Sequence, residues 1–438
     1  MAAEPDVAVI GLGYVGLTLS AVFAATGRTV LGVERDPAVA AAVRAGRPPF
    51  FEQGLAETLA NLPAGRLRVA ESMPDRLPPA VVICVGTPVD PWTHQPDLTA
   101  FDHVVDAVAA RVTPDTLVVV RSTVPVGTTE QRVLPKLAAR TASPRLAYCP
   151  ERTIQGQALA ELRQLPQIIG PLDAASAAAA ERLFGGVADR LVTVSSPRAA
   201  ELVKLVNNAH TDVIYGFGNE VALLADALRL DADEIIHAAN VDYPRPDISR
   251  PGFVGGSCLT KDPYLLLHSV APAGLRPDLV ASARAVNESV PAHAVDRVLT
   301  AIKSAGHALS TAKVLVCGMA YKGRPVTDDV RGSAAAKVIG LLAGRVTTQL
   351  FGLFFVLRRA HRRARIPADH AHRRVARRER GNVARRPPRI RGARPVHGGR
   401  GDAPPGGRLR HVGGAASGVR RHHRGALSAV GPWLSGPW

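Results

Sequence analysis

Cysteine is scarce in this sequence, with four residues in a chain of 438. So few thiols cannot build a disulfide framework, and their scarcity is typical of proteins from a reducing compartment. The N-terminus also lacks the basic and apolar segments of a secretory signal, so we expect a cytoplasmic protein. Long apolar runs are missing too. The longest late run, residues 346–357, is too short to cross a bilayer and contains Gln349, which predicts no membrane-spanning segment.

Lysine is absent from residues 345–438, which contain 22 arginines and only three acidic residues. This segment therefore carries a net charge of +19, whereas residues 1–344 carry −2. The chain as a whole has the net charge of a nucleic-acid binder, but its main body has the near-neutral balance of an ordinary enzyme. We expect any contact with nucleic acid to be non-specific and confined to this arginine-rich segment.

Two interpretations of residues 345–438 remain open. One is a disordered basic arm for nucleic acid or another polyanion. The other, which we favour, is a frame-shifted translation of a GC-rich gene, because such a frame over-produces arginine, glycine and proline codons. Gly, Pro, His and Arg dominate the segment, and after residue 357 no helical or strand period persists. Either interpretation predicts no packed domain there.

A glycine-rich turn follows the first apolar segment. Residues 7–10 read as a short strand, residues 11–16 are Gly-Leu-Gly-Tyr-Val-Gly, and a helical pattern continues to about residue 26. In such a turn Gly11 permits the tight bend, Gly13 lets the backbone approach a pyrophosphate, and Gly16 lets helix and strand pack closely. The sequence therefore predicts dinucleotide binding.

An acidic residue stands where the ribose of the cofactor is expected. A second strand, residues 29–33, ends at Glu34, 23 residues after Gly11. A carboxylate there can accept hydrogen bonds from both ribose hydroxyls of NAD and would repel the extra phosphate of NADP. Arg35, directly beside it, leaves NADP open.

Three more apolar strands, residues 80–85, 116–120 and 146–149, open into loops with polar residues. Ligands of open parallel sheets lie beyond the carboxyl ends of the strands, so these loops are expected to line one cleft. The residues concerned are Thr87, Thr123, Glu151 and Arg152.

A long amphipathic helix is predicted over residues 197–230, where apolar residues recur at three- and four-residue spacing. Lys204 and Asn208 are four residues apart, so they share one face of this helix. A helix of this kind after a dinucleotide-binding unit commonly bridges two domains and can supply a dimer face.

One cysteine differs in context from the other three, which lie within or at the end of apolar strands. Cys258 follows Gly255-Gly256-Ser257 and precedes Lys261 and Asp262. Exposed N–H groups of a glycine-rich loop and a nearby cation favour a thiolate and an oxyanion. Asp262 is placed to act as a base on water.

A second dinucleotide-type unit is expected near the end of the main body. Residues 313–319 read as a strand, and a helix is expected to start within residues 327–333 and to run to about residue 343. No second strand is recognisable before the arginine-rich segment.

Taken in order, the motifs GLGYVG, GTPVD, STVPVGTT, PER, KLVNN, GGSCLTKD and AYKG…DDVRGS resemble the UDP-glucose/GDP-mannose dehydrogenase family. The resemblance implies an α/β protein with an N-terminal Rossmann domain (1–196), a helical central and dimerisation domain (197–305) and the start of a UDP-sugar-binding domain (306–344). Residues 345–438 depart from the family's pattern, which would continue as alternating strands and helices.

The resemblance also implies roles for single residues, with no metal. Cys258 matches the nucleophile that carries the sugar as a thiohemiacetal and then as a thioester. Lys204 matches the lysine that stabilises the C6 oxyanion, and Asn208 matches the partner of that lysine one turn on. Asp262 matches the acid beside the nucleophile. Thr123 and Glu151 match residues that position the hydrolytic water. The implied NAD contacts are Gly11, Gly13, Tyr14, Val15, Gly16, Glu34, Arg35, Thr87, Thr123 and Arg331. The implied UDP-sugar contacts are Glu151, Arg152, Lys204, Asn208, Gly255 and Lys322.

The motifs leave two branches of the family open for the sugar. Residues 150–162 look like the branch that oxidises UDP-N-acetylhexosamines, notably UDP-N-acetylmannosamine, for polysaccharide synthesis. Ser257 and Lys261 look instead like the UDP-glucose branch. We favour the acetamido sugar. Two other hypotheses stay open: an NAD-binding protein impaired in catalysis, and a polyanion binder acting through residues 345–438.

Overall fold

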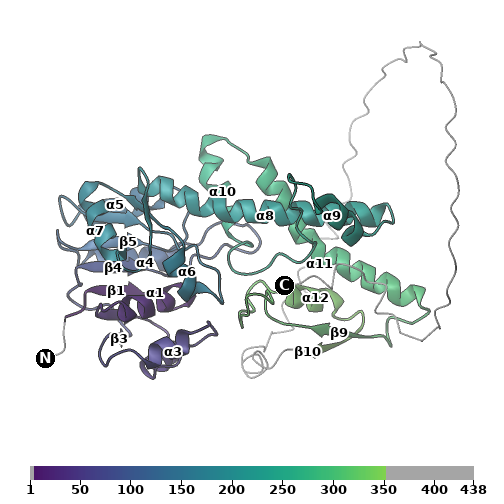
Figure 1. Cartoon of the computed structure of the whole chain (residues 1–438), viewed down its shortest axis with the longest axis horizontal. Helices are drawn as coiled ribbons and strands as arrows, with labels where there is room; N and C mark the ends of the chain where they lie inside the picture. Colours follow the sequence, from purple (N-terminus) through teal and green to yellow (C-terminus); the bar gives the residue numbers. More distant parts are fainter. Residues whose placement is uncertain (1–3, 352–438) are drawn as a thin grey trace, which may run out of the picture. The chain divides into compact units, whose positions relative to one another are not determined.

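The computed structural model describes residues 4–351, which form an α/β fold (Figure 1). Its main sheet has the strand order β3-β2-β1-β4-β5-β6-β7-β8, and β6 and β7 are its antiparallel neighbours. The first six strands have the order of a doubly wound dinucleotide-binding sheet. The strands are β1 (Val7–Ile10), β2 (Val30–Val33), β3 (Leu67–Ala70), β4 (Ala80–Ile83), β5 (Leu117–Val120), β6 (Arg145–Tyr148), β7 (Gln167–Pro171) and β8 (Leu191–Thr193).

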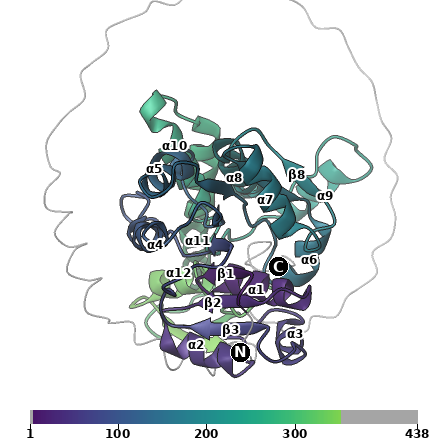
Figure 2. The same cartoon turned by 90° about the vertical axis from the view of Figure 1, so that its left-hand side faces the viewer.

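Helices cover both faces of this sheet, so its inner strands are apolar at consecutive positions rather than at alternate ones. In β1, Val7 and Val9 belong to one buried core with Phe23, while Ala8 and Ile10 belong to the core on the opposite face. Figure 2 shows β1, β2 and β3 side by side with α1 and α3 next to them. The helices of this part are α1 (Tyr14–Ala25), α2 (Pro37–Arg44), α3 (Leu55–Ala60), α4 (Thr99–Ala109), α5 (Leu134–Ala138), α6 (Ala158–Gln164) and α7 (Ala174–Phe184), with a π-helical turn, η1 (Thr129–Val133), before α5.

The predicted long helix is present as α8 (Pro197–Ala227). It starts there because the Ser196 side chain accepts a hydrogen bond from Ala199 N, and a proline occupies the first helical position. It is followed by α9 (Ala232–Asn240), α10 (Asp262–Val270), a 3₁₀ turn, η2 (Ala271–Ala273), and α11 (Asp278–Ser304). Helices α10 and α11 both pack against α8.

The prediction that no second strand follows near residue 343 is wrong. Strand β9 (Lys313–Cys317), helix α12 (Ala334–Leu342) and strand β10 (Thr347–Phe351) form a parallel β-α-β unit in which Thr347 pairs with Lys313. The helix also begins later than predicted, because residues 327–333 form a loop. Strand β10 was not predicted because it has only five residues and lies where the composition becomes arginine-rich.

None of the helices within residues 4–351 combines the length and apolarity needed to cross a membrane. The expectations for residues 352–438 lie outside the described residues.

Candidate active site

The glycine-rich turn leaves room for a ligand at one position and none at the others. Gly11 has a φ of +91°, and a Cβ there would lie 2.9 Å from the Cys84 carbonyl oxygen. A Cβ on Gly16 would lie only 1.8 Å from the Gly11 oxygen, whereas a Cβ on Gly13 would have no atom within 4 Å. The turn and the helix–strand contact therefore require Gly11 and Gly16, and Gly13 faces the open space that a pyrophosphate needs.

Glu34, at the end of β2, is fixed beside this turn. Its Oε2 accepts a hydrogen bond from Leu12 N at 2.8 Å, and its Oε1 accepts one from Asp36 N at 2.9 Å. The carboxylate thus lies where the ribose of a bound dinucleotide is expected. Arg35 is exposed. Together with the space at Gly13, this arrangement fits NAD.

The loop before α12 also lies against the glycine-rich turn. The Tyr14 hydroxyl donates to Asp328 Oδ1 at 2.8 Å, and the Arg331 guanidinium lies 5.2 Å from the centre of the Tyr14 ring. Asp329 forms an ion pair of 2.7 Å with Arg331. Arg331 is therefore next to the predicted cofactor site although more than 300 residues separate it from Tyr14.

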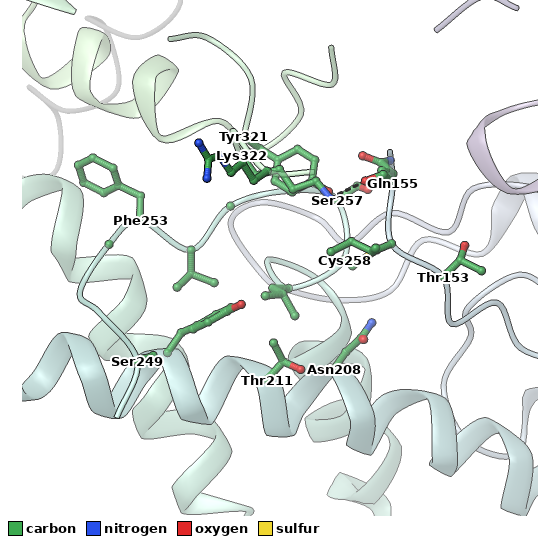
Figure 3. A pocket seen from close by; sticks show the side chains of 18 of the residues that line it. Thr153, Gln155, Asn208, Thr211, Ser249, Phe253, Ser257, Cys258, Tyr321 and Lys322 are labelled. Carbon is green, nitrogen blue, oxygen red and sulfur yellow. Dashed lines mark hydrogen bonds between the residues drawn. The ribbon is translucent and has the colours of Figure 1, made fainter. Parts of the chain in front are cut away.

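A cavity of about 510 Å³ lies between α8, the loop of residues 249–259, the loop of residues 152–155 and residues 321–324. Figure 3 shows the labelled side chains of Asn208 and Thr211 on one side of it, and Tyr321 on the other. Among its described lining residues five are basic and none is acidic. The basic residues are Arg152, Lys204, Arg250, Lys322 and Arg324. Such a lining suits an anionic ligand that carries phosphate groups.

Cys258 lies in the wall of this cavity, just before α10. It is the exposed member of the glycine-rich loop, and its carbonyl oxygen accepts a hydrogen bond from Asp262 N at 2.8 Å. Gly256 has a φ of +87°, and a Cβ on it would lie 2.7 Å from the Tyr321 ring. The Gly-Gly pair therefore lets the cysteine loop approach residue 321 closely.

Lys204 and Asn208, one turn apart on α8, line the same cavity as Cys258. Lys204 is buried. Asn208 Nδ2 donates to Asp262 Oδ2 at 2.5 Å, and Lys261 Nζ lies 3.1 Å from Asp262 Oδ1. The Asp262 side chain is fully buried and does not line the cavity. It can therefore influence a ligand there through Asn208, to which it is hydrogen-bonded.

Lys261 also donates to the Thr87 hydroxyl at 3.3 Å, and that hydroxyl in turn donates to the Thr123 carbonyl oxygen. Lys261 was expected only as a cation near Cys258, and its contacts tie it to Asp262 and to Thr87. Thr123 does not line the cavity.

Glu151 is the predicted site residue whose surroundings differ most from expectation. It does not line the cavity, and its Oε2 lies 2.6 Å from the buried Arg121 guanidinium. Its Oε1 accepts hydrogen bonds from the N–H groups of Arg152 and Thr153. Burial alone would raise the pKa of Glu151, but Arg121 and the Thr153 N–H lower that pKa overall. The carboxylate stays ionised and holds the loop that forms one wall of the cavity.

Two predicted substrate residues are partly engaged by backbone oxygens. Lys322 Nζ donates to the Gln155 carbonyl at 2.7 Å, and Arg152 Nη2 donates to the Pro166 carbonyl at 2.5 Å. Burial lowers the pKa of Lys322, although Glu52 partly offsets this effect. Both residues still line the cavity, as does Gly255.

Comparison with known families gives two adjacent matches. Residues 5–187 match the NAD binding domain of the UDP-glucose/GDP-mannose dehydrogenase family, and residues 198–289 match the central domain of that family.

Individual proteins are similar over most of their length. A UDP-N-acetyl-D-mannosamine dehydrogenase from Pyrococcus horikoshii is 35% identical over 347 residues, 78% of this chain and 81% of that protein. One from Escherichia coli K12 is 31% identical over 353 residues, 77% of this chain and 82% of that protein. The structure of a UDP-glucose dehydrogenase from Pyrobaculum islandicum, 32% identical, has a TM-score of 0.73 and covers 82% of this chain and 84% of its own.

Proposed function

The chain belongs to the UDP-glucose/GDP-mannose dehydrogenase family and is an NAD-dependent oxidoreductase acting on a CH–OH group, and we propose that its substrate is UDP-N-acetyl-D-mannosamine. On this proposal the C6 alcohol of the sugar is oxidised twice, to the carboxylate, without release of the aldehyde. The observation that supports this two-step oxidation is the shared cavity of Cys258, Lys204 and Asn208.

The cofactor would be held by the glycine-rich turn, Glu34 and Arg331. When bound, NAD accepts a hydride from C6 in each of the two oxidations. The negative charge of Glu34 favours NAD over NADP.

The substrate would enter the cavity with its diphosphate among the basic side chains. Arg250, Lys322 and Arg324 line it together with Lys204 and Arg152. Their charge compensates the two phosphates, and the volume of about 510 Å³ is within the range of small-molecule sites.

The covalent chemistry would begin at Cys258. In the first oxidation the alcohol loses a proton and a hydride and becomes an aldehyde, while the Lys204 ammonium and the Asn208 amide stabilise the charge on O6. The Cys258 thiolate then adds to C6, forming an S–C bond and an oxyanion. Loss of a second hydride gives the thioester. Water then adds to C6 and the S–C bond breaks, which releases the carboxylate, restores the thiolate and gives two protons to the solvent.

Three residues were expected to act on water in the hydrolytic step. Thr123 and Glu151 lie outside the cavity lining, and Asp262 is buried behind Asn208. We propose that Asp262 orients Asn208 toward C6 and holds Lys261 beside Thr87, and that Glu151 shapes the site by holding the loop that bears Arg152 and Thr153.

The choice of sugar rests on two observations. Residues 150–162 resemble the acetamido branch, and the similar proteins of Pyrococcus and Escherichia carry the name UDP-N-acetyl-D-mannosamine dehydrogenase. The alternative, UDP-glucose, is supported by Ser257, by Lys261 and by the similar Pyrobaculum structure.

The deciding experiment is NADH formation with purified protein and equal concentrations of UDP-N-acetylmannosamine, UDP-N-acetylglucosamine and UDP-glucose. The proposal expects the highest kcat/KM for the first sugar. A higher kcat/KM for UDP-glucose would assign the chain to the UDP-glucose branch. No NADH formation with any of the three sugars would support the hypothesis of an NAD-binding protein impaired in catalysis.

Assembly and location are part of the same proposal. Helix α8 exposes several large apolar side chains, among them Leu202, Val206, Phe217 and Leu224, which supports a homodimer through this helix. Light scattering after size exclusion tests the dimer, and Phe217→Asp should give monomers.

The scarcity of cysteine supports a cytoplasmic location.

A further inference from the structure

A buried polar cluster joins helices α8 and α11. It consists of Asp212 and Asn219 on α8 and Arg284 and Asn287 on α11, all at most 2% exposed. Burying an ion pair and two amides is unfavourable unless each finds partners, and well-packed apolar residues would serve a purely structural contact equally well. A polar cluster at this position therefore needs another explanation, which the backbone groups bonded to it supply.

One end of the cluster is bonded to the residue after the cysteine. Arg284 Nη1 lies 2.6 Å from Asp212 Oδ1, and the same nitrogen donates to the Leu259 carbonyl at 2.8 Å. Leu259 directly follows Cys258 and also lines the cavity.

The other end is bonded to the start of the same loop. Asn287 Nδ2 donates to Asp212 Oδ1 at 2.9 Å, and Asn219 Nδ2 donates to Asn287 Oδ1 at 2.8 Å. Asn219 Oδ1 then accepts a hydrogen bond from Gly252 N at 2.8 Å. A continuous chain of hydrogen bonds thus runs from Gly252 to Leu259 through the interior.

The segment between these two points needs such support. It contains the Gly255-Gly256 pair, and no helix or strand lies within residues 251–259. Glycine has more conformational freedom to lose than any other residue, so the loop itself does little to fix its shape. A nucleophile, however, must be held within about 0.5 Å of its productive position.

We propose that Arg284 and Asn219 are positioning residues that fix the two ends of the Cys258 loop, so that the thiolate captures the aldehyde before it can escape. This inference rests on the proposed role of Cys258. It adds two residues outside the cavity lining to the machinery of the reaction.

The test uses Asn219→Ala and Arg284→Lys, which keeps the positive charge but ends one bond short of the position of Arg284 Nη1, the nitrogen that bonds both Asp212 and Leu259. Asn240→Ala is the matched control, because Asn240 also bonds a backbone segment through both amide atoms, at Ile248, outside the cysteine loop. If Arg284→Lys does not fold, Asn219→Ala carries the test alone.

Two readouts are required, and the first needs no activity. Hydrogen–deuterium exchange of peptides within residues 249–261 should become faster in both test variants and stay at the parent rate in the control. Unchanged exchange in the test variants would overturn the inference. This measurement remains valid even if no UDP-sugar is oxidised, in which case the proposed function alone fails.

The second readout is the yield of NADH per uronate with an aldehyde trap present. The parent and the control should give two NADH per uronate. The test variants should give more, because aldehyde escapes after the first oxidation, and their rate of uronate formation should fall at least about 10-fold. Faster exchange with an unchanged yield would show that the cluster is only structural and would contradict the proposal.

Discussion

Arg121 and Glu151 form an ion pair of 2.6 Å at the carboxyl ends of β5 and β6, with both side chains buried. Arg121 also donates to the Cys149 carbonyl and to Gln167 Oε1, so the guanidinium is tied to two strands. The Glu151 carboxylate is fully occupied by Arg121 and the N–H groups of its own loop. This relationship makes Glu151 a structural support of the cavity wall.

Glu151→Gln should therefore destabilise the protein strongly. Removing the negative charge leaves the buried Arg121 unpaired, which typically costs about 3–5 kcal/mol. Chemical denaturation measures the loss, and Asp115→Asn, which breaks the exposed ion pair with Arg145, is the control with little expected effect. A Glu151→Gln variant as stable as the parent would show that the pair contributes nothing.

The same pair predicts a pH dependence of stability. Because the pKa of Glu151 is lowered in the folded protein, its stabilisation is fully present above the pKa of the unfolded glutamate. It is lost as the pH falls through the lower folded-state pKa. The difference in unfolding free energy between the parent and Glu151→Gln should accordingly narrow as the pH falls. A constant difference would rule out the linkage.

Cofactor selection should depend on Glu34. Replacing it by alanine should reduce the preference for NAD over NADP, because the charge that opposes the extra phosphate is gone. Initial rates with each cofactor at equal concentration give the ratio. Arg35→Ala is the informative companion: a selective loss of NADP activity there would show that Arg35 accommodates the phosphate. If the parent reduces NADP faster than NAD, the assignment of Glu34 is wrong.

Lys204→Ala should lower kcat by about 10²–10³-fold, the usual consequence of losing an oxyanion partner, and should leave NAD affinity unchanged. Stopped-flow turnover and fluorescence titration with NAD separate the two effects. Lys303, an exposed lysine on α11, provides the control substitution. A loss confined to NAD affinity would remove Lys204 from the chemistry.

The parts of the site that lie within one motif could be predicted from the sequence. The three- and four-residue spacing of apolar residues predicted α8, and the four-residue spacing of Lys204 and Asn208 predicted that they share one face of it. The glycine spacing indicated the turn between β1 and α1, and the context of Cys258 singled it out as the candidate nucleophile, a role that stays a prediction. The predictions of α8 and of the glycine-rich turn are confirmed because one local element fixes the relation between the residues.

The remaining parts depend on contacts between distant residues. The bond from Tyr14 to Asp328 joins positions 314 apart, and neither residue's neighbours indicate it. Arg284 and Asn219 lie in helical patterns where a polar residue would ordinarily face solvent, so only their burial reveals a role. Strand β10 was missed because its five residues adjoin a segment of very different composition.

The central claim is that Cys258 carries the sugar between the two oxidations. The direct measurement compares the parent and Cys258→Ser with UDP-N-acetylmannosamine and NAD, following uronate by chromatography and NAD binding by titration. We expect the serine variant to bind NAD with the affinity of the parent and to form no uronate, because only the covalent step needs the thiol. Uronate formation by Cys258→Ser at the rate of the parent would contradict it.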